Sequence, residues 1–153
     1  MLSIDTNILF PAMVRTDAHH ASAFTFLNEL EDRDDVAISE FALLELYVLL
    51  RNPAVLIKPL GPLEATGVCT ALRQHPHWQI LGFPGISRDF HDAFWPKLAE
   101  PGFARRRAYD WRMALTLVRQ GVEEFATVNV KDFGGFGFKK VWNPIKAEKS
   151  KGE

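Results

Sequence analysis

Short apolar runs that end abruptly at polar turns, with helix-length segments between them, constrain the fold of this chain most strongly. These runs are residues 2–4, 36–38, 79–81, 125–128 and 140–142. Short apolar runs bounded by turn residues are typical of buried strands. Strands that alternate with helices favour parallel pairing, because parallel neighbours need a crossover connection. The pattern therefore predicts an α/β domain with a mostly parallel central sheet.

Capping and breaking residues delimit the helices between these runs. Asp17, Ser39 and Ser87 each stand where a helix N-cap is expected. Proline and glycine interrupt or end the segments, as at Pro11 and Gly121. The sequence predicts helices over about residues 7–14, 18–30, 40–51, 62–75, 88–94 and 105–120.

The length of 153 residues fits one domain, and the sequence contains no internal repeat or linker. We expect one domain over residues 1–145 and a polar tail over residues 146–153. No apolar run approaches the roughly 20 residues that a membrane-spanning helix needs. The first residues do not resemble a signal peptide, and the single cysteine, Cys69, has no internal disulfide partner. We therefore expect a cytoplasmic protein.

Two aspartates directly follow predicted strands. Asp5 ends the first strand and Asp132 lies shortly after the fourth. In open α/β sheets the functional crevice lies beyond the carboxyl ends of the strands, where both residues fall. An alternative interpretation of Asp5, Thr6 and Asn7 is a helix cap followed by an Asx turn.

Glu45 is the one acidic residue inside an otherwise apolar helix. At helical spacing it shares a face with Phe41, Leu44 and Val48, so we expect it in or beside the buried stripe. A buried carboxylate needs a cation, a cluster of donors or a metal ion. A salt bridge with an arginine such as Arg51 is the structural alternative.

Asp110 repeats this pattern on the last long helix. It falls on the apolar face with Met113 and Leu117, and Arg112 marks another face. An acidic residue in the first turn also interacts favourably with the helix dipole, which is the structural alternative. The dipole accounts for an acid near the N-terminus, but not for its place on the apolar side.

Four carboxylates from separate elements repel one another if they converge, unless a cation neutralises them. Hard oxygen ligands favour Mg²⁺, with Mn²⁺ as a substitute. Thr127 and Asn129 stand close before Asp132 and are candidates for further oxygen ligands or for orienting water. Thr6 and Asn7 are the corresponding polar candidates after Asp5.

The motifs around these acids, in this order and spacing, resemble PIN-domain nucleases and specifically the VapC toxins of toxin–antitoxin pairs. The matching segments lie at residues 2–9, 39–46, 109–115, 127–133 and 141–144. The resemblance implies a three-layer α/β/α fold, Mg²⁺-dependent RNA cleavage that inhibits growth, and a small VapB-type antitoxin. It also implies that Asp5, Glu45, Asp110 and Asp132 are catalytic and bind the metal.

Basic residues near the last helix are candidates for contacts with RNA phosphates. The formal net charge is −1, so any nucleic-acid contact depends on local patches. The candidates are Arg105, Arg106, Arg107, Arg112, Lys139 and Lys140. The alternative for the triple arginine is a cluster that only faces solvent.

Other functions remain open from the residues alone. A homodimer is expected, and the apolar excess over residues 41–50 and around residues 24–30 would serve either a dimer contact or an antitoxin groove. A PIN-domain nuclease that is not a toxin, or a non-catalytic binding module of the same fold, would carry a similar pattern. A phosphoryl-transfer domain also places aspartates at strand ends, but that interpretation leaves Glu45 unexplained.

Overall fold

Five parallel strands form the central sheet. The structure is a computed structural model that describes residues 1–145, and the predicted polar tail, residues 146–153, lies outside the described residues. The strands are β1 (Leu2–Ile4), β2 (Val36–Ser39), β3 (Gln79–Leu81), β4 (Glu124–Ala126) and β5 (Lys140–Trp142). They lie in the order β3-β2-β1-β4-β5, and every neighbouring pair is parallel. The predicted α/β class with a parallel sheet is confirmed.

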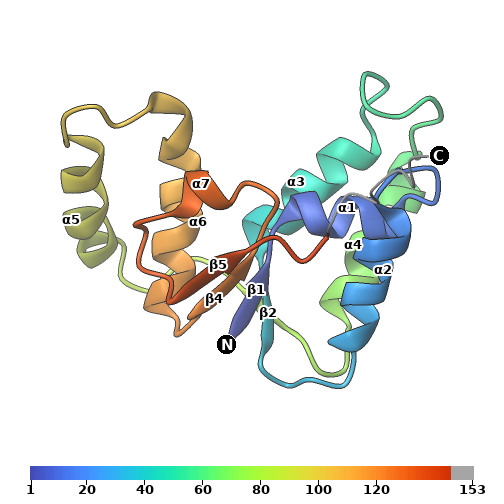
Figure 1. The fold of residues 1–153 in the computed structure, drawn as a ribbon, viewed down its shortest axis with the longest axis horizontal. Helices are drawn as coiled ribbons and strands as arrows, with labels where there is room; N and C mark the ends of the chain where they lie inside the picture. The colour runs from blue at the N-terminus through green and yellow to red at the C-terminus, as the bar shows by residue number, and fades with distance from the viewer. Residues whose placement is uncertain (146–153) are drawn as a thin grey trace, which may run out of the picture.

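Helices cover both faces of this sheet and complete the expected three layers. The helices are α1 (Thr6–Met13), α2 (His20–Glu29), α3 (Glu40–Leu50), α4 (Pro62–Arg73), α5 (Ser87–Leu98), α6 (Ala108–Arg119) and the short α7 (Val130–Phe133). Figure 1 shows α5 and α6 on one side of the sheet and α1, α2 and α4 on the other. None of the described helices is long and apolar enough to cross a membrane.

The strand order reverses beside β1, and this reversal creates the crevice of the fold. The chain builds β1, β2 and β3 outward in one direction, then returns to place β4 on the other side of β1. Ile4 pairs with Ala126, and the amide of Asp5 donates to the carbonyl of Ala126 at 2.9 Å. Ligands of open parallel sheets bind at such a reversal. The residues that follow β1 and β4 therefore meet at one point.

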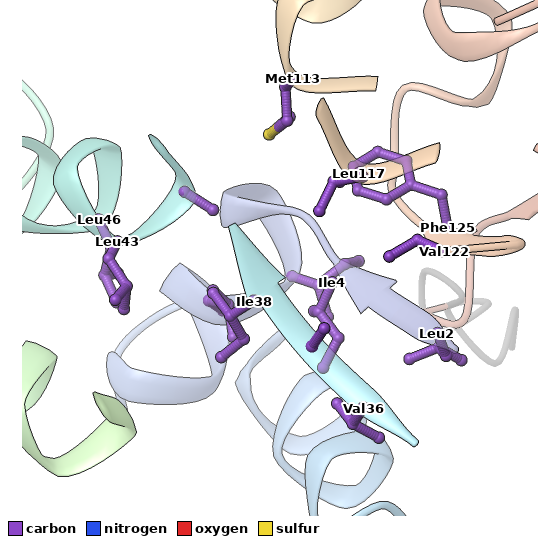
Figure 2. Packing of buried hydrophobic residues seen from close by; sticks show 14 of the residues in the cluster. Leu2, Ile4, Val36, Ile38, Leu43, Leu46, Met113, Leu117, Val122 and Phe125 are labelled. Carbon is purple, nitrogen blue, oxygen red and sulfur yellow. The ribbon is translucent and has the colours of Figure 1, made fainter. Parts of the chain in front are cut away.

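The core surrounds the two central strands (Figure 2). Ile4, Ile38 and Phe125, from three neighbouring strands, are fully buried. Because both faces of a parallel sheet are covered by helices, its strands are continuously apolar rather than alternating. Leu117 of α6 and Leu46 of α3 close the core from the flanking helices.

Two predicted N-caps are wrong, and one is confirmed. Ser39 accepts a hydrogen bond from the amide of Phe41 at 3.2 Å and caps α3. Asp17 instead accepts from the amide of His19, so its side chain forms a turn before α2 begins at His20. Ser87 is the first residue of α5 and makes no capping bond. Local spacing marks a polar residue near a helix start, but the path of the preceding loop decides whether it caps.

The predicted helix over residues 105–120 has a different beginning. Its first three residues form a short 3-10 helix, η1 (Arg105–Arg107), and α6 begins at Ala108. The fourth strand ends at Ala126 rather than at Val128, since the chain turns away to form the network around Asn7. The helix α7 was not predicted, because four residues are too few to show a periodicity.

Candidate functional site

Asp5 occupies the floor of the crevice between β1 and β4. Its side chain is 6% exposed and accepts hydrogen bonds from the amide of Thr6 and from the hydroxyl of Thr127, both at 2.7 Å. The first bond caps α1, which confirms the capping alternative for this residue. Asp5 is thereby fixed in orientation by groups that follow two separate strands, β1 and β4.

Polar residues after β1 and β4 lock the two segments together. Asn7 donates to the Thr127 hydroxyl at 3.1 Å and accepts from the amide of Val128 at 3.1 Å. The amide of Asn129 also donates to that hydroxyl, at 3.0 Å. Thr127 is therefore the centre of a network that ties Asp5 to the start of α7. Asn129 participates through its backbone, and its side chain is exposed.

Glu45 is exposed, so its predicted place on a buried stripe is wrong. The buried face of α3 is formed by Ala42, Leu43, Leu46 and Leu50. Its neighbour Leu44 is 64% exposed. The helix is apolar almost all round, so its sequence does not reveal which face packs inward. Glu45 is nevertheless held at the site, because the hydroxyl of Thr6 donates to its Oε2 at 3.0 Å.

Asp110 and Asp132 reach the same region from α6 and α7. Asp110 is half-buried in the first turn of α6, with Met113 and Leu117 on the buried side, as predicted. Asp132 lies in α7 and forms an ion pair with Arg106 at 3.2 Å. The first turn of α6 and the helix after β4 are thus brought to the edge where β1 ends.

The electrostatics of the acids reflect this convergence. Burial raises the pKa of Asp5 from 3.8 to about 6, against the opposing hydrogen bonds from Thr127 and Thr6. The negative charges of Glu45 and Asp110 raise it further. Burial also raises the pKa of Asp110, with contributions from Asp132 and Glu45. Asp5 and Asp110 therefore each lie within electrostatic reach of two other acids of the set.

The predicted basic residues do not act as one patch. Arg107 donates to the carbonyls of Asp132 and Gly134, with distances of 2.7–3.2 Å, and lies 4.3 Å from the ring centre of Phe136. Its guanidinium is therefore committed to holding α7. Arg105 is exposed, whereas Arg106 pairs with Asp132.

The lysines lie away from the acids. Lys139 pairs with Glu123 at 2.7 Å, and both residues precede strands, at the amino edge of the sheet. Lys140 lies 4.3 Å from the ring centre of Trp142. The structure does not bring either lysine together with Asp5.

Arg112 of α6 contacts aromatic residues of both α3 and α6. Its guanidinium lies over the ring of Phe41 at 4.4 Å and over that of Tyr109 at 5.4 Å. The sequence interpretation missed these two aromatic residues. Tyr109 directly precedes Asp110, and Phe41 stands one helical turn before Glu45. These positions beside the acids could have identified both residues from the sequence.

The donor set suits a hard divalent cation, but it is not preassembled. Carboxylate and hydroxyl oxygens are the ligands that Mg²⁺ prefers, and like-charge repulsion among the acids would be relieved by a cation. Within residues 1–145, no three His, Cys, Asp or Glu side chains are close enough to form a complete metal site. Metal binding would therefore draw the carboxylates inward, and Asp132 would exchange Arg106 for the ion.

Comparison with known proteins identifies the family. No family model matches the sequence. Ribonuclease VapC24 of Mycobacterium tuberculosis, in strains CDC 1551 and H37Rv, is 46% identical over 148 residues, which cover 97% of this chain and 99% of the relative. The chain belongs to the VapC ribonuclease family. This VapC protein therefore aligns over nearly its whole length with a relative that is named a ribonuclease.

Solved structures agree on the fold of this VapC chain. VapC20 of M. tuberculosis, described as a toxin that cleaves the sarcin–ricin loop, superposes with a TM-score of 0.64 at 16% identity, over 89% of this chain and 92% of that one. VapBC2 of Rickettsia felis gives a TM-score of 0.63 at 16% identity, over 93% and 97%. FitAcB of Neisseria gonorrhoeae gives 0.64 at 21% identity, over 94% and 98%. The expected PIN-domain fold is confirmed.

Proposed function

We propose that this VapC protein is a Mg²⁺-dependent endoribonuclease and the toxin of a VapBC pair. The observation that carries the proposal is the convergence of Asp5, Glu45, Asp110 and Asp132 beyond the carboxyl ends of β1 and β4. Placing four acids against one another costs free energy in the folded protein without a cation. Such a cost is typical of functional sites.

The chain's own residues would bind and orient the metal. Mg²⁺ would supply activation of water and stabilisation of the phosphate charge. Thr127 and the amide of Thr6 hold Asp5 as the central ligand, and the hydroxyl of Thr6 aims Glu45. Arg107 fixes the backbone of Asp132, which positions the acid of α7. The proposed substrate is RNA, because the family relatives are named ribonucleases.

Cleavage of total RNA by the purified protein tests this proposal. We expect cleavage with Mg²⁺, loss of cleavage with EDTA, and loss of at least about 100-fold in rate for Asp5→Asn and Asp110→Asn. Asp34→Asn removes an exposed acid before β2, at the opposite edge of the sheet, and should cleave like the parent. Equal cleavage by the parent and Asp5→Asn, or cleavage that persists in EDTA, would refute the proposal.

Growth on expression distinguishes a toxin from another PIN-domain nuclease. We expect expression of the parent to arrest growth and Asp5→Asn to relieve the arrest at equal protein levels. Normal growth with an actively cleaving parent would favour a housekeeping nuclease. Absence of cleavage and of arrest would favour a non-catalytic binding module.

A small VapB-type antitoxin is the proposed partner, and two adjoining hollows support a place for it. One, of about 820 Å³, lies between the end of α1 and the loop after α3 and includes Phe10 and Ile57. The second, of about 470 Å³, shares Phe10 and extends to Asn7 and Val128 beside the acids. An apolar segment of the antitoxin that lay along both hollows would reach Asn7 and Val128, beside the acids.

Co-purification with a co-expressed VapB-type antitoxin tests this placement. Ile57 is fully exposed, so Ile57→Asp should leave the fold intact and weaken the complex. Leu63→Asp, at an exposed position of α4 outside both hollows, is the matched control and should keep it. Loss of the complex in both variants, or in neither, would contradict the placement.

We also propose a homodimer through the outward face of α3. Leu44 and Val48 are 64% and 55% exposed there, and Phe83, 67% exposed, continues the apolar surface against Phe41. An exposed apolar patch of this kind is typical of protein interfaces. Sedimentation should show a dimer for the parent and a monomer for the double variant that combines Leu44→Ser and Val48→Ser. Ile86→Ser, at an exposed apolar residue of the loop before α5, is the control.

A further inference from the structure

Arg112 is held in an aromatic bracket that joins the two helices flanking the acids. Its guanidinium lies over the rings of Phe41 of α3 and Tyr109 of α6, at 4.4 and 5.4 Å from their centres. Phe41 stands one helical turn before Glu45, and Tyr109 directly precedes Asp110. Figure 1 shows α3 and α6 on either side of the carboxyl edge of the sheet. The bracket therefore joins α3 and α6 next to Glu45 and Asp110.

The guanidinium of Arg112 retains unused hydrogen-bonding capacity. Its Nε is buried, and no hydrogen bond to it is made by the described part of the chain, residues 1–145. No carboxylate within that same range pairs with it. A purely structural arginine would be expected to use a carboxylate or carbonyls, as Arg107 does. The charge of the partly buried Arg112 therefore has no carboxylate partner within the described residues, and a phosphate would supply one.

Tyr109 offers an accessible aromatic face beside this charge. Its side chain is 71% exposed although it stands in the first turn of α6, next to Asp110. Unpaired bases stack on such faces without regard to sequence, and an adjacent arginine contacts the backbone between them. A duplex presents its bases stacked on one another and leaves this face unused.

We propose that Arg112 and Tyr109 form a substrate-binding subsite for an unpaired nucleotide next to the scissile phosphate. Tyr109 stacks on the base, and Arg112, oriented by Phe41, binds the phosphate. The inference rests on the proposed RNA cleavage and adds to it two residues that would hold the substrate beside the acids. Neither residue takes part in the bond-breaking step.

Binding and cleavage of a short unpaired RNA separate this inference from the proposed function. Fluorescence anisotropy in EDTA measures the Kd without any cleavage, and Mg²⁺-dependent turnover gives kcat and KM. We expect Tyr109→Ala and Arg112→Gln to raise both the Kd and KM by about 5- to 100-fold. The kcat should stay within about threefold of the parent, because binding is lost equally in the ground state and the transition state.

Conservative variants and the salt dependence of binding distinguish the loss of an RNA contact from a loss of folding. Tyr109→Phe keeps the aromatic face and should bind like the parent. Arg112→Gln should reduce the slope of log K against log salt by about 0.7, the value for one lost contact to a single strand. Arg119→Gln, at an exposed arginine at the far end of the same helix, is the charge control. Trp95→Ala, at a 58% exposed aromatic residue of α5, is the aromatic control.

Several results would overturn the subsite. An unchanged Kd and KM in Tyr109→Ala and Arg112→Gln would do so, as would equal losses in the two controls. A shift of Tyr109→Ala from dimer to monomer with an unchanged Kd would assign the bracket to the subunit contact instead. If the parent binds RNA in EDTA but never cleaves it, the proposed function fails while the binding comparison still decides this inference.

Discussion

At the residue scale, Asp5 shows how environment changes the role of a common capping residue. An aspartate before a helix is ordinarily solvated and ionised, and its cap stabilises the helix. Here it is 6% exposed and faces the charges of Glu45 and Asp110. The same side chain therefore stabilises α1 as a cap and destabilises the metal-free fold as a charge.

We expect Asp5→Asn to stabilise the metal-free protein at pH 7. The pKa of Asp5 is about 6 when folded, above its ordinary 3.8, so its ionisation lowers stability as pH rises through this window. A shift of about two pKa units corresponds to about 3 kcal/mol, partly offset by a weakened bond to Thr127. Urea unfolding in EDTA should therefore show a gain of about 1–3 kcal/mol at pH 7 and little change near pH 4. A loss of stability at pH 7 would contradict this.

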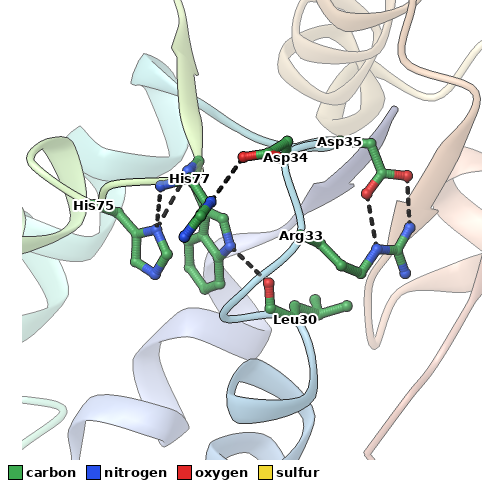
Figure 3. Close-up of polar contacts among 7 residues, drawn as sticks. Leu30, Arg33, Asp34, Asp35, His75 and His77 are labelled. Atoms are coloured by element: carbon green, nitrogen blue, oxygen red, sulfur yellow. Dashed lines mark hydrogen bonds and ion pairs between the residues drawn. The ribbon is translucent and has the colours of Figure 1, made fainter.

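His77 gives a second pH-dependent contact, at the amino edge of the sheet. The hydrogen bond from its ring to Asp34, at 2.7 Å, raises the pKa of His77 above 6.5 (Figure 3). A raised histidine pKa contributes stability below about 6.5 that is lost as pH rises through the folded-state pKa. NMR titration should find the raised pKa in the parent and a lower one in Asp34→Asn. Glu123→Gln, which removes an acid paired with Lys139, should leave it unchanged.

At the element scale, the helix α7 depends on a residue outside it. Four residues form too short a helix to be stable alone. Arg107 of η1 bonds the carbonyls of Asp132 and Gly134 and covers Phe136, so it provides the C-terminal support that α7 lacks. The acid carried by α7 is therefore positioned by η1.

Arg107→Lys should lower stability and cleavage together. Lysine keeps the charge but loses the paired bonds to the two carbonyls, and the expected cost is about 1–3 kcal/mol. Thermal unfolding and RNA cleavage measure the two effects. Arg106→Lys is the matched control: its side chain is 74% exposed, and its ion pair contributes at most about 1 kcal/mol. Equal effects of the two substitutions would refute the supporting role of Arg107.

At the scale of the whole molecule, the proposed metal site would make the stability of the fold depend on a cation. Asp5, Glu45, Asp110 and Asp132 belong to segments that surround the reversal of strand order. A cation that bound them would link both halves of the sheet. Because no three such side chains are grouped closely enough within residues 1–145, binding of the proposed cation would also order the site.

We expect Mg²⁺ to raise the free energy of unfolding of the parent. The gain is about 2.7 kcal/mol when the free ion reaches 100 times its Kd. Asp110→Asn should reduce or abolish this gain, and Na⁺ at matched ionic strength should not reproduce it. Thermal unfolding over a Mg²⁺ series measures the effect. A gain of the same size in Asp110→Asn would place the ion elsewhere.

The sequence by itself determined the alternation of strands and helices, and with it the parallel sheet and the placement of Asp5 near a crevice. These features are local, because apolar runs, caps and breakers act within a few residues of themselves. Asp110 was also predictable, since the periodicity of its amphipathic helix marks the buried side.

Only the tertiary structure decided which face of α3 is buried, which basic residues approach the acids, and what orients each carboxylate. Helix α3 is apolar on almost every side, so the spacing of its apolar residues does not show that Glu45 points outward. Arg107 meets Asp132, and Thr127 meets Asp5, across 25 and 122 residues of sequence. Such contacts depend on the strand order β2-β1-β4 and on the packing of α6 against the sheet, which no local pattern encodes. The environment of Asp5 is therefore formed by residues that come together only when the sheet is complete.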